Sequence, residues 1–425
     1  HLGEMVAYRY DLADRLVATT RYATPLSAAQ LALLANPNST AELSALLPAG
    51  AAADMWSWTV YDNGSRVIQS IGSDGSVAGF VYDASDRLIR TTSSFTRLTA
   101  VQIAALKLAL PTVPVSVSSH AKDAVTRQFY DAAGQLIGTL NAQGYLSEIV
   151  YDGAGHTIQD IAYATLTLAA DRASGSFATL RAQVAGGSTV DRVTRYVYDR
   201  RNQLAYVIDG LGGVTGYLYN SAGALTTTRH FATALNPSQT AFAYAAVQGA
   251  VVASGADRIG YTVYNGMGRA AYTVDAEGGV TGYTYDTAGR VIRVIQFADI
   301  YNAAAGLPAL AAMQAWAADP AQASDAGNRV TRNWHNERGD LRYTVDAGGY
   351  LRGFTYDAEG RAIGQSAWAN AVVVADSASL AQLATAAAGA GAVITVSSSY
   401  DNAGRLLTST DGEGIVTRHV YNALG

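Results

Sequence analysis

The sequence predicts a mainly β protein built as a tandem array of hairpins, and three observations support this fold class. A seven-residue phrase recurs thirteen times, paired copies stand twenty-one residues apart, and longer alanine-rich segments separate the pairs. Self-similarity at a fixed period is typical of repeat architectures, in which each repeat packs on its neighbours. The length of 425 residues alone would have suggested about three globular domains. The repeats indicate one continuous array over 1–425 instead.

The recurring phrase has the chemistry of a tight turn. Clear copies are Tyr130–Leu136, Tyr285–Val291 and Tyr356–Ala362. The first position is Tyr except at His335, the second is always Asp or Asn, and the fifth is Gly in nine copies. A type I turn favours Asp or Asn at its first residue and Gly at its fourth. We call this phrase the hairpin module and number its positions from first to seventh.

The fifth position tests that interpretation, because glycine is replaced there in four modules. Asp14, Asp86 and Asn202 occupy three of them, and Asp and Asn tolerate positive φ better than other residues. Ser65 is the exception, and Gly64 directly before it predicts a turn shifted by one residue. The residues predicted to form the structural turns are Asp131, Gly134, Asp152, Gly155, Asp286, Gly289, Asp357, Gly360, Asp401 and Gly404.

Module spacing predicts repeats of about 68 residues, each with two hairpins and one long insert. Six intervals are twenty-one residues, as from Tyr61 to Tyr82, and the intervals between pairs run from 44 to 51. The expected repeats are 54–122, 123–190, 191–256, 257–327, 328–392 and a partial 393–425, after a partial first repeat, 1–53. The chain stops inside a module, so we expect a fragment of a longer polypeptide.

Aromatic residues are predicted to line one strand face. A Gly-rich turn such as Asp275–Gly279 opens the strand that leads into the second module of a pair. The residue two before the module's first position then shares its face, since side chains alternate along a strand. Cross-strand pairs in such a ladder contribute about 0.2–1 kcal/mol each. The ladder is predicted to contain Tyr130, Tyr151, Tyr217, Tyr219, Tyr283, Tyr285, Phe354 and Tyr356.

The inserts are predicted to be short amphipathic helices that lie on or at the rim of the sheet. Ala100–Leu110 ends at Pro111, and Ala375–Ala388 is rich in Ala and Leu. Residues 39–42 form a capping box before an apolar run at 43–47. Alanine-rich helices of this length need packing to be stable. An acidic or amide residue precedes three modules by seven positions, at Asp191, Asp257 and Asn328.

Composition excludes several functional classes. Charged residues are 15% of the chain against a usual share of about 25%, and the net charge of −5 offers no basic stripe for nucleic acid. Cysteine is absent, which removes disulfides and thiolate metal sites. No apolar run approaches the roughly 18 residues of a membrane span. The six histidines lack metal-ligand spacing and most Asp residues belong to turns, so we expect no catalytic, cofactor or metal site.

The phrase Tyr-Asp-x-x-Gly-Arg-Leu resembles the YD repeat of the RHS family. Tyr285–Val291, Tyr356–Arg361 and Tyr400–Leu406 match it closely, and the thirteen copies cover nearly the whole chain. That family includes bacterial RHS polymorphic toxins, the shell subunits of insecticidal toxin complexes, and teneurins. The resemblance implies a spiralling sheet that closes into a hollow shell or tube, in a secreted or cell-surface, extracellular protein.

The function that the resemblance implies is a non-catalytic structural wall that encloses or presents a toxin or effector. The expected partners are the rest of the same polypeptide and an enclosed C-terminal cargo. The alternative is an extracellular filament or adhesin that binds glycans or cell-surface proteins, or associates with itself. The Asp-Pro-x-Gly type sequence that ends toxin shells is absent, because Asp319-Pro320 is followed by Ala321-Gln322. No self-cleavage site is therefore predicted.

Overall fold

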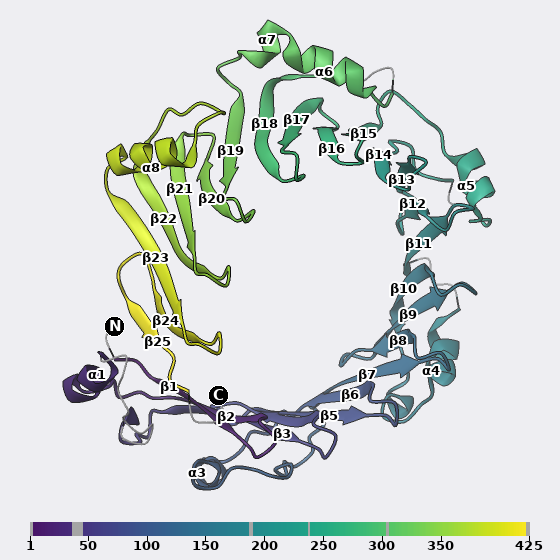
Figure 1. The fold of residues 1–425 in the computed structure, drawn as a ribbon. Helices are drawn as coiled ribbons and strands as arrows, with labels where there is room; N and C mark the ends of the chain where they lie inside the picture. Colours follow the sequence, from purple (N-terminus) through teal and green to yellow (C-terminus); the bar gives the residue numbers. More distant parts are fainter. Residues whose placement is uncertain (1–2, 36–45, 187–189, 237–238, 303–305, 422–425) are drawn as a thin grey trace. The chain divides into compact units, whose positions relative to one another are not determined.

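The computed structural model describes residues 3–35, 46–186, 190–236, 239–302 and 306–421. These residues form 25 strands in chain order with short helices between groups of strands (Figure 1). The predicted fold class, β-hairpins with short helical inserts, is confirmed. The chain divides into two compact units, 1–196 with 208–210 and 197–207 with 211–425.

The first unit contains three groups of strands and the helices between them. Its strands are β1 (Val6–Tyr10), β2 (Leu16–Arg21), β3 (Met55–Tyr61), β4 (Val67–Ile71), β5 (Val77–Tyr82), β6 (Leu88–Ser93), β7 (Ala124–Tyr130), β8 (Leu136–Leu140), β9 (Tyr145–Tyr151) and β10 (Thr157–Leu166). Its helices are α1 (Ala28–Ala35), α3 (Ala100–Leu108), the 3-10 turn η1 (Ala169–Asp171) and α4 (Phe177–Val184). At the division between the units lie β11 (Arg192–Tyr198) and β12 (Leu204–Ile208).

The second unit repeats the same order. Its strands are β13 (Val214–Tyr219), β14 (Leu225–His230), β15 (Arg258–Tyr264), β16 (Ala270–Val274), β17 (Gly279–Tyr285), β18 (Val291–Ile300), β19 (Arg329–His335), β20 (Leu341–Val345), β21 (Tyr350–Tyr356), β22 (Ala362–Ala371), β23 (Val393–Tyr400), β24 (Leu406–Thr410) and β25 (Val416–Arg418). Its helices are α5 (Tyr244–Ala250), α6 (Leu310–Ala318), α7 (Pro320–Ala323) and α8 (Leu380–Gly389).

The strands form an antiparallel meander, so alternate connections lie at opposite ends of the strands, along two opposite rims of the sheet. Within β3–β6, two hairpin modules lie at one edge, while a Gly-rich turn and the insert lie at the other. We call these the turn edge and the insert edge. The pairing between the two strands shifts by one residue at the module, since Tyr61 pairs with Val67 while Val60 pairs with Gln69. This bulge at the first position recurs from hairpin to hairpin and increases strand twist.

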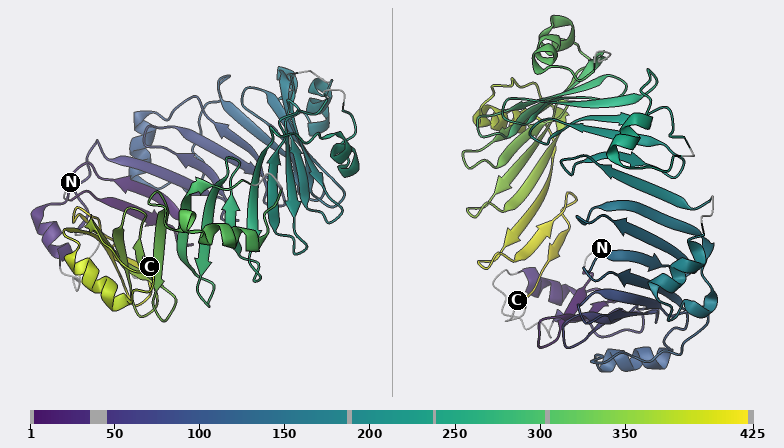
Figure 2. Two further views of the ribbon diagram at one scale, coloured as in Figure 1. Left: turned by 90° about the horizontal axis from the view of Figure 1, so that it is seen from above. Right: turned by 90° about the vertical axis from the view of Figure 1, so that its right-hand side faces the viewer.

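The core lies at the insert edge, where helix side chains cover the residues on either side of the Gly-rich turn. In the first unit, Ile71 and Val77 are 1% and 4% exposed and pack with Leu106 of α3. In the second unit, Val345 and Leu351 pack in the same way with Leu383 of α8. The corresponding trios in two other repeats are Leu140, Leu146 and Leu180, and Val274, Val280 and Met313. Equal positions on the strands place α3 and α4 on the same sheet face of the first unit (Figures 1 and 2).

Three sequence-based details differ from the structure. Helix α3 ends at Leu108, because Ala109 is extended, and α8 starts at Leu380 behind a capping box at Ser379 rather than at 375. The turn at Ser65 does not shift, since Ser65 itself adopts φ 62° and its amide donates to the Asp62 carbonyl at 3.1 Å. The capping box at 39–42 and most of the run at 43–47 lie outside the described residues.

Candidate functional site

The turn edge is the part of the molecule where the repeated residues gather, and its geometry starts from the second position of the module. In the turn of the first module, the Asp11 side-chain Oδ1 accepts hydrogen bonds from the amides of Ala13 at 2.9 Å and Arg15 at 3.0 Å. The amide of Asp14 donates to the Asp11 carbonyl at 3.1 Å, and Asp14 has a φ of 57°. One carboxylate therefore caps the whole turn, which explains why only Asp or Asn occupies this position.

The predicted turn residues occupy equivalent places. The carboxylates of Asp131, Asp152, Asp286, Asp357 and Asp401 each accept from the amide four residues later, at 2.8–2.9 Å. The fifth-position glycines have left-handed φ values, namely Gly134 86°, Gly155 86°, Gly289 86°, Gly360 84° and Gly404 83°. The fifth-position residues other than Gly also have positive φ, between 57° and 62°.

In six of the described modules an aspartate at the second position and an arginine at the sixth form an ion pair. Arg66 and Asp62 are a representative pair, with Nη2 and Oδ2 2.6 Å apart. The other five are Asp11–Arg15, Asp83–Arg87, Asp286–Arg290, Asp357–Arg361 and Asp401–Arg405, at 2.6–2.7 Å. The side-chain hydrogen bond from Arg66 is the largest influence that lowers the pKa of Asp62, and the Arg66 amide lowers it further. The carboxylates therefore stay charged well into acid.

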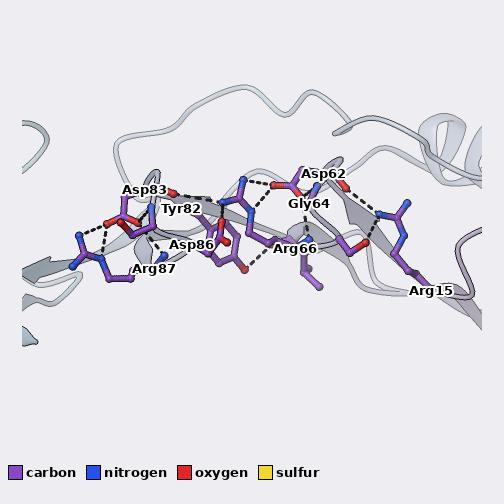
Figure 3. Close-up of polar contacts among 11 residues, drawn as sticks. Arg15, Asp62, Gly64, Arg66, Tyr82, Asp83, Asp86 and Arg87 are labelled. Atoms are coloured by element: carbon purple, nitrogen blue, oxygen red, sulfur yellow. Dashed lines mark hydrogen bonds and ion pairs between the residues drawn. The ribbon is translucent and has the colours of Figure 1, made fainter. Parts of the chain in front are cut away.

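The sixth-position side chain also reaches the next turn along the edge. Figure 3 shows Arg15, Arg66 and Arg87 spaced along this edge. The Nη1 atom of Arg15 donates to the Asp62 carbonyl at 2.9 Å, and Nη1 of Arg66 lies 2.5 Å from Oδ1 of Asp86 (Figure 3). Arg15 and Arg66 thus join their own turn carboxylates to the backbone or fifth position of the turn that follows.

The first-position tyrosine completes the connection between neighbouring hairpins. The Tyr82 hydroxyl donates to the carbonyl of Val67, the seventh residue of the preceding module, at 3.0 Å (Figure 3). The same bond joins Tyr61–Leu16, Tyr130–Leu88, Tyr151–Leu136, Tyr219–Leu204, Tyr264–Leu225, Tyr285–Ala270, Tyr356–Leu341, Tyr400–Ala362 and Tyr421–Leu406, at 2.8–3.4 Å. The preceding arginine lies over the ring, as with Arg66 over Tyr82 at 5.0 Å.

The predicted aromatic ladder contains these tyrosines and the half-buried aromatic residues two positions before some of them. They lie on the face opposite the helix-packed residues, because Val60 and Trp58, which alternate with Tyr61 along β3, are 1% exposed. Sequence reasoning assigned the tyrosines to ring packing and missed the hydroxyl bond and the arginine above the ring. The frequent combination of Tyr at the first position and Arg at the sixth was the available signal.

The His335 module shows how the edge adapts when tyrosine is missing. His335 cannot reach the preceding carbonyl, and Nδ2 of Asn333 donates to the Val291 carbonyl at 3.2 Å instead. Asn333 and His335 share a face, since they are two residues apart on β19. Burial lowers the pKa of His335, and the charge of Arg290 lowers it further. The imidazole is therefore neutral at pH 7, as a packing residue would be.

A second repeated device, at the insert edge, was visible in the sequence only as a spacing. Residues seven positions before a module accept a hydrogen bond from the amide at the start of the insert. Oδ1 of Asp257 accepts from Ala232 at 2.9 Å, and Oδ2 accepts from Ser254 at 3.0 Å. The equivalent bonds are Asp54–Ala23, Asp123–Phe95, Asp191–Ala164 and Asn328–Ala298, at 2.8–2.9 Å. In these five inserts the side chain holds the two ends of the insert together, whereas Val393 occupies the equivalent position in the last one.

One buried polar group was not predicted. Glu148 is 7% exposed, its carboxylate accepts from the Tyr163 hydroxyl, and Nε of Arg181 lies 2.7 Å from it. Burial and the Glu148 carboxylate raise the pKa of Tyr163 to about 12. Because Arg181 belongs to α4, the group fixes that helix on β9 and β10. A group of this kind cannot be predicted from the sequence, since its three residues are far apart in the chain.

Two further features concern other kinds of site. Among the described residues, no group of three or more His, Asp and Glu side chains is arranged to hold a metal ion, and no helix is long and apolar enough to cross a membrane. Asp319, the only Asp before Pro, caps α7 by accepting from the Ala321 amide at 2.9 Å.

No protein-family model and no curated protein matches this chain. Among solved structures, it aligns with the TcdB2-TccC3-Cdc42 crystal structure at 11% identity and a TM-score of 0.42, covering 96% of this chain and 17% of that one. A structure of the Photorhabdus luminescens Tc holotoxin pore aligns at 13% identity and a TM-score of 0.44, covering 96% and 18%. TcdB2-TccC3 without its hypervariable C-terminal region aligns at 15% and 0.40, covering 99% and 20%. The chain spans about a fifth of the length of these chains, and alignments at this level do not assign it to a family.

Proposed function

We propose that this chain is a non-catalytic wall segment of a larger extracellular RHS/YD-repeat protein, and that the wall encloses or presents a toxin or effector. The proposal adds the sequence resemblance to the geometry of the turn edge. The partners are the rest of the same polypeptide and an enclosed cargo.

The observation that carries the proposal is the set of bonds between successive hairpins. A tyrosine hydroxyl and an arginine from neighbouring modules form the same contacts whether 21 or more than 40 residues separate the modules. Bonds of this kind extend a sheet by addition of hairpins without a change in geometry. Continuous extension is what a wall requires, and no step in it needs a reactive group.

The two sheet faces support the same proposal. Within each unit the helices pack on the face that carries residues such as Trp58 and Val345, and the first-position tyrosines of the modules lie on the other face. A wall with one helix-covered face and one face lined by half-buried aromatic and polar side chains presents different chemistry on its two sides. The tyrosine face is the one that we assign to cargo.

Limited proteolysis of the natural full-length polypeptide tests this function. We expect the segments outside the repeats to be cleaved much more slowly than the same segments expressed alone. The double variant Tyr285→Phe/Tyr356→Phe should speed their cleavage, whereas Tyr350→Phe, on an exposed ring, should not. Equal cleavage rates in the full-length and isolated forms would overturn enclosure and favour the alternative, an extended filament or adhesin.

A further inference from the structure

A cleft of about 490 Å³ in the first unit has a strongly positive lining. It lies where β6 meets β7, beside the segment 173–177 that leads into α4. Three arginines line it, Arg87, Arg90 and Arg127, with Asp83 as the acidic residue. Asp83 is already paired with Arg87 at 2.7 Å. The charges of the other two arginines are therefore left without a carboxylate.

Arg90 and Arg127 are direct cross-strand partners. The register pairs them residue to residue between β6 and β7. Like charges directly opposite in a sheet destabilise it. Nη1 of Arg127 donates to the carbonyls of Arg172 and Gly175, at 3.1 and 2.9 Å, so this guanidinium is held at the cleft. No carboxylate among the described residues pairs with either arginine.

The second unit contains the equivalent cleft, of about 380 Å³, between β18 and β19. Arg293 and Arg332 are cross-strand partners there, at the module positions of Arg90 and Arg127. In this cleft Asp376 forms ion pairs with both arginines, and its Oδ2 lies 3.3 Å from Nε of Arg293. The equivalent arginine pair is thus bound by a carboxylate side chain of the protein in the second unit and, among the described residues, by none in the first.

The missing carboxylate can be located by position. Asp376 lies three residues before Ser379, the N-cap of α8, and Ala173 lies three residues before Ser176, the N-cap of α4. Ala173 lines the first cleft, so a methyl group is present where the second unit has an acid. Burial and the nearby charge of Arg90 both lower the pKa of Arg127, as expected where positive charge is uncompensated.

From this internal comparison we infer that the cleft at Arg90 and Arg127 binds a carboxylate group supplied by another molecule, either a small organic acid or an acidic peptide side chain. Arginine binds carboxylates through paired, charge-assisted hydrogen bonds. The volume of about 490 Å³ exceeds what one carboxylate fills and falls in the range of ligand sites. The site is independent of any enclosed cargo, and its test does not involve one.

Calorimetric titration tests the inference with acetate and with a blocked pentapeptide containing one central Asp, at constant ionic strength. We expect saturable binding of the peptide, and competition by acetate would identify a small acid as a sufficient ligand. Arg90→Gln should weaken binding at least tenfold, while Arg200→Gln, at an exposed turn arginine outside the cleft, should leave it unchanged. Binding that survives Arg90→Gln, or binding of phosphate with no binding of carboxylates, would overturn the assignment.

Exchanging the acid between the two units gives an independent test. Ala173→Asp should abolish peptide binding and raise the unfolding temperature, because the built-in carboxylate takes the site. Asp376→Ala should add a second binding site of similar affinity and lower the unfolding temperature. If Ala173→Asp changes neither quantity, the arginine pair does not select an anion and the inference fails.

Discussion

At the turn edge, neighbouring hairpins meet through polar side chains of nearly constant type, whereas at the insert edge they meet through apolar side chains of varying type. The tyrosine, aspartate and arginine contacts at the turn edge are half-exposed and recur almost unchanged. The helix side chains that pack on the sheet at the insert edge are Leu, Val or Met, and several are fully buried. Buried apolar area supplies most of the stability of a fold, while directional polar contacts specify register. The difference indicates that the inserts stabilise the array and the turn edge keeps successive hairpins aligned.

Glycine has a different role at each edge as well. Gly278, at the insert edge, has a φ of 88°, and a Cβ there would lie 2.9 Å from the Tyr301 carbonyl oxygen. Gly360, at the turn edge, has a φ of 84° with no atom within 4 Å of a Cβ. At Gly360 glycine serves the left-handed backbone conformation alone, and at Gly278 it also permits close approach of another chain segment.

The largest effect is expected from the core of the insert edge. Leu383→Ala removes a side chain that is 0% exposed between Val345 and Leu351, and we expect it to lower the free energy of unfolding by about 3 kcal/mol. Leu108→Ala, at a leucine that is 91% exposed, is the matched control and should cost less than about 0.5 kcal/mol. Equal costs in urea unfolding would mean that the inserts do not stabilise the sheet.

The two glycines separate close approach from backbone conformation. Gly360→Ala should cost about 1 kcal/mol, the lower end of the range for a left-handed non-glycine residue. Gly278→Ala should cost about 2–3 kcal/mol, because the Tyr301 carbonyl must also move. Urea midpoints of the two variants measure the difference, and a smaller effect at Gly278 would reverse the assignment of the two roles.

A smaller effect is expected from a single turn-edge hydroxyl. Tyr356→Phe loses the hydrogen bond to the Leu341 carbonyl, which measures 3.0 Å, and should cost about 1 kcal/mol. Hydrogen exchange should increase mainly in β20 and β21, where that bond joins two hairpins. Tyr350→Phe is the control, since its ring is 47% exposed. Faster hydrogen exchange across the whole chain would contradict a purely local role for this hydrogen bond.

The smallest effect concerns acid. The backbone and side chain of Arg290 lower the pKa of Asp286 from its ordinary 3.8, and Arg405 does the same for Asp401. A carboxyl whose pKa is lower in the folded than in the unfolded state stabilises the fold fully above about pH 4. This contribution disappears as the pH falls through the lowered pKa. The double variant Asp286→Asn/Asp401→Asn should therefore lose less stability than wild type between pH 5 and about pH 2. A larger loss in the variant would show that these pairs do not contribute.

Much of the turn edge could be predicted because its chemistry is local. The carboxylate of Asp286 bonds the amide of Arg290 only four residues away, and Gly289 supplies the left-handed conformation within the same turn. Helix positions were predicted well where Pro111 or a run of Ala and Leu marked them, with errors of a few residues at the ends. The predicted shift at Ser65 was wrong because the rest of the turn holds serine in the left-handed conformation that a neighbouring glycine could have taken. The repeat boundaries, the cargo and the closed shell stay predictions.

By itself, the sequence determined where the chain turns, that the first-position tyrosines share a strand face with the residues two positions before them, and where helices interrupt the sheet, since these depend on residues within one turn or one strand. Only the tertiary structure decided which atoms join one hairpin to the next. Tyr130 bonds the carbonyl of Leu88 across 42 residues, and Asp376 reaches an arginine pair on β18 and β19. Inserts of unequal length lie between these partners, so sequence separation cannot identify them. Their pairing follows from the register between strands of neighbouring hairpins, which exists only once those hairpins have come together.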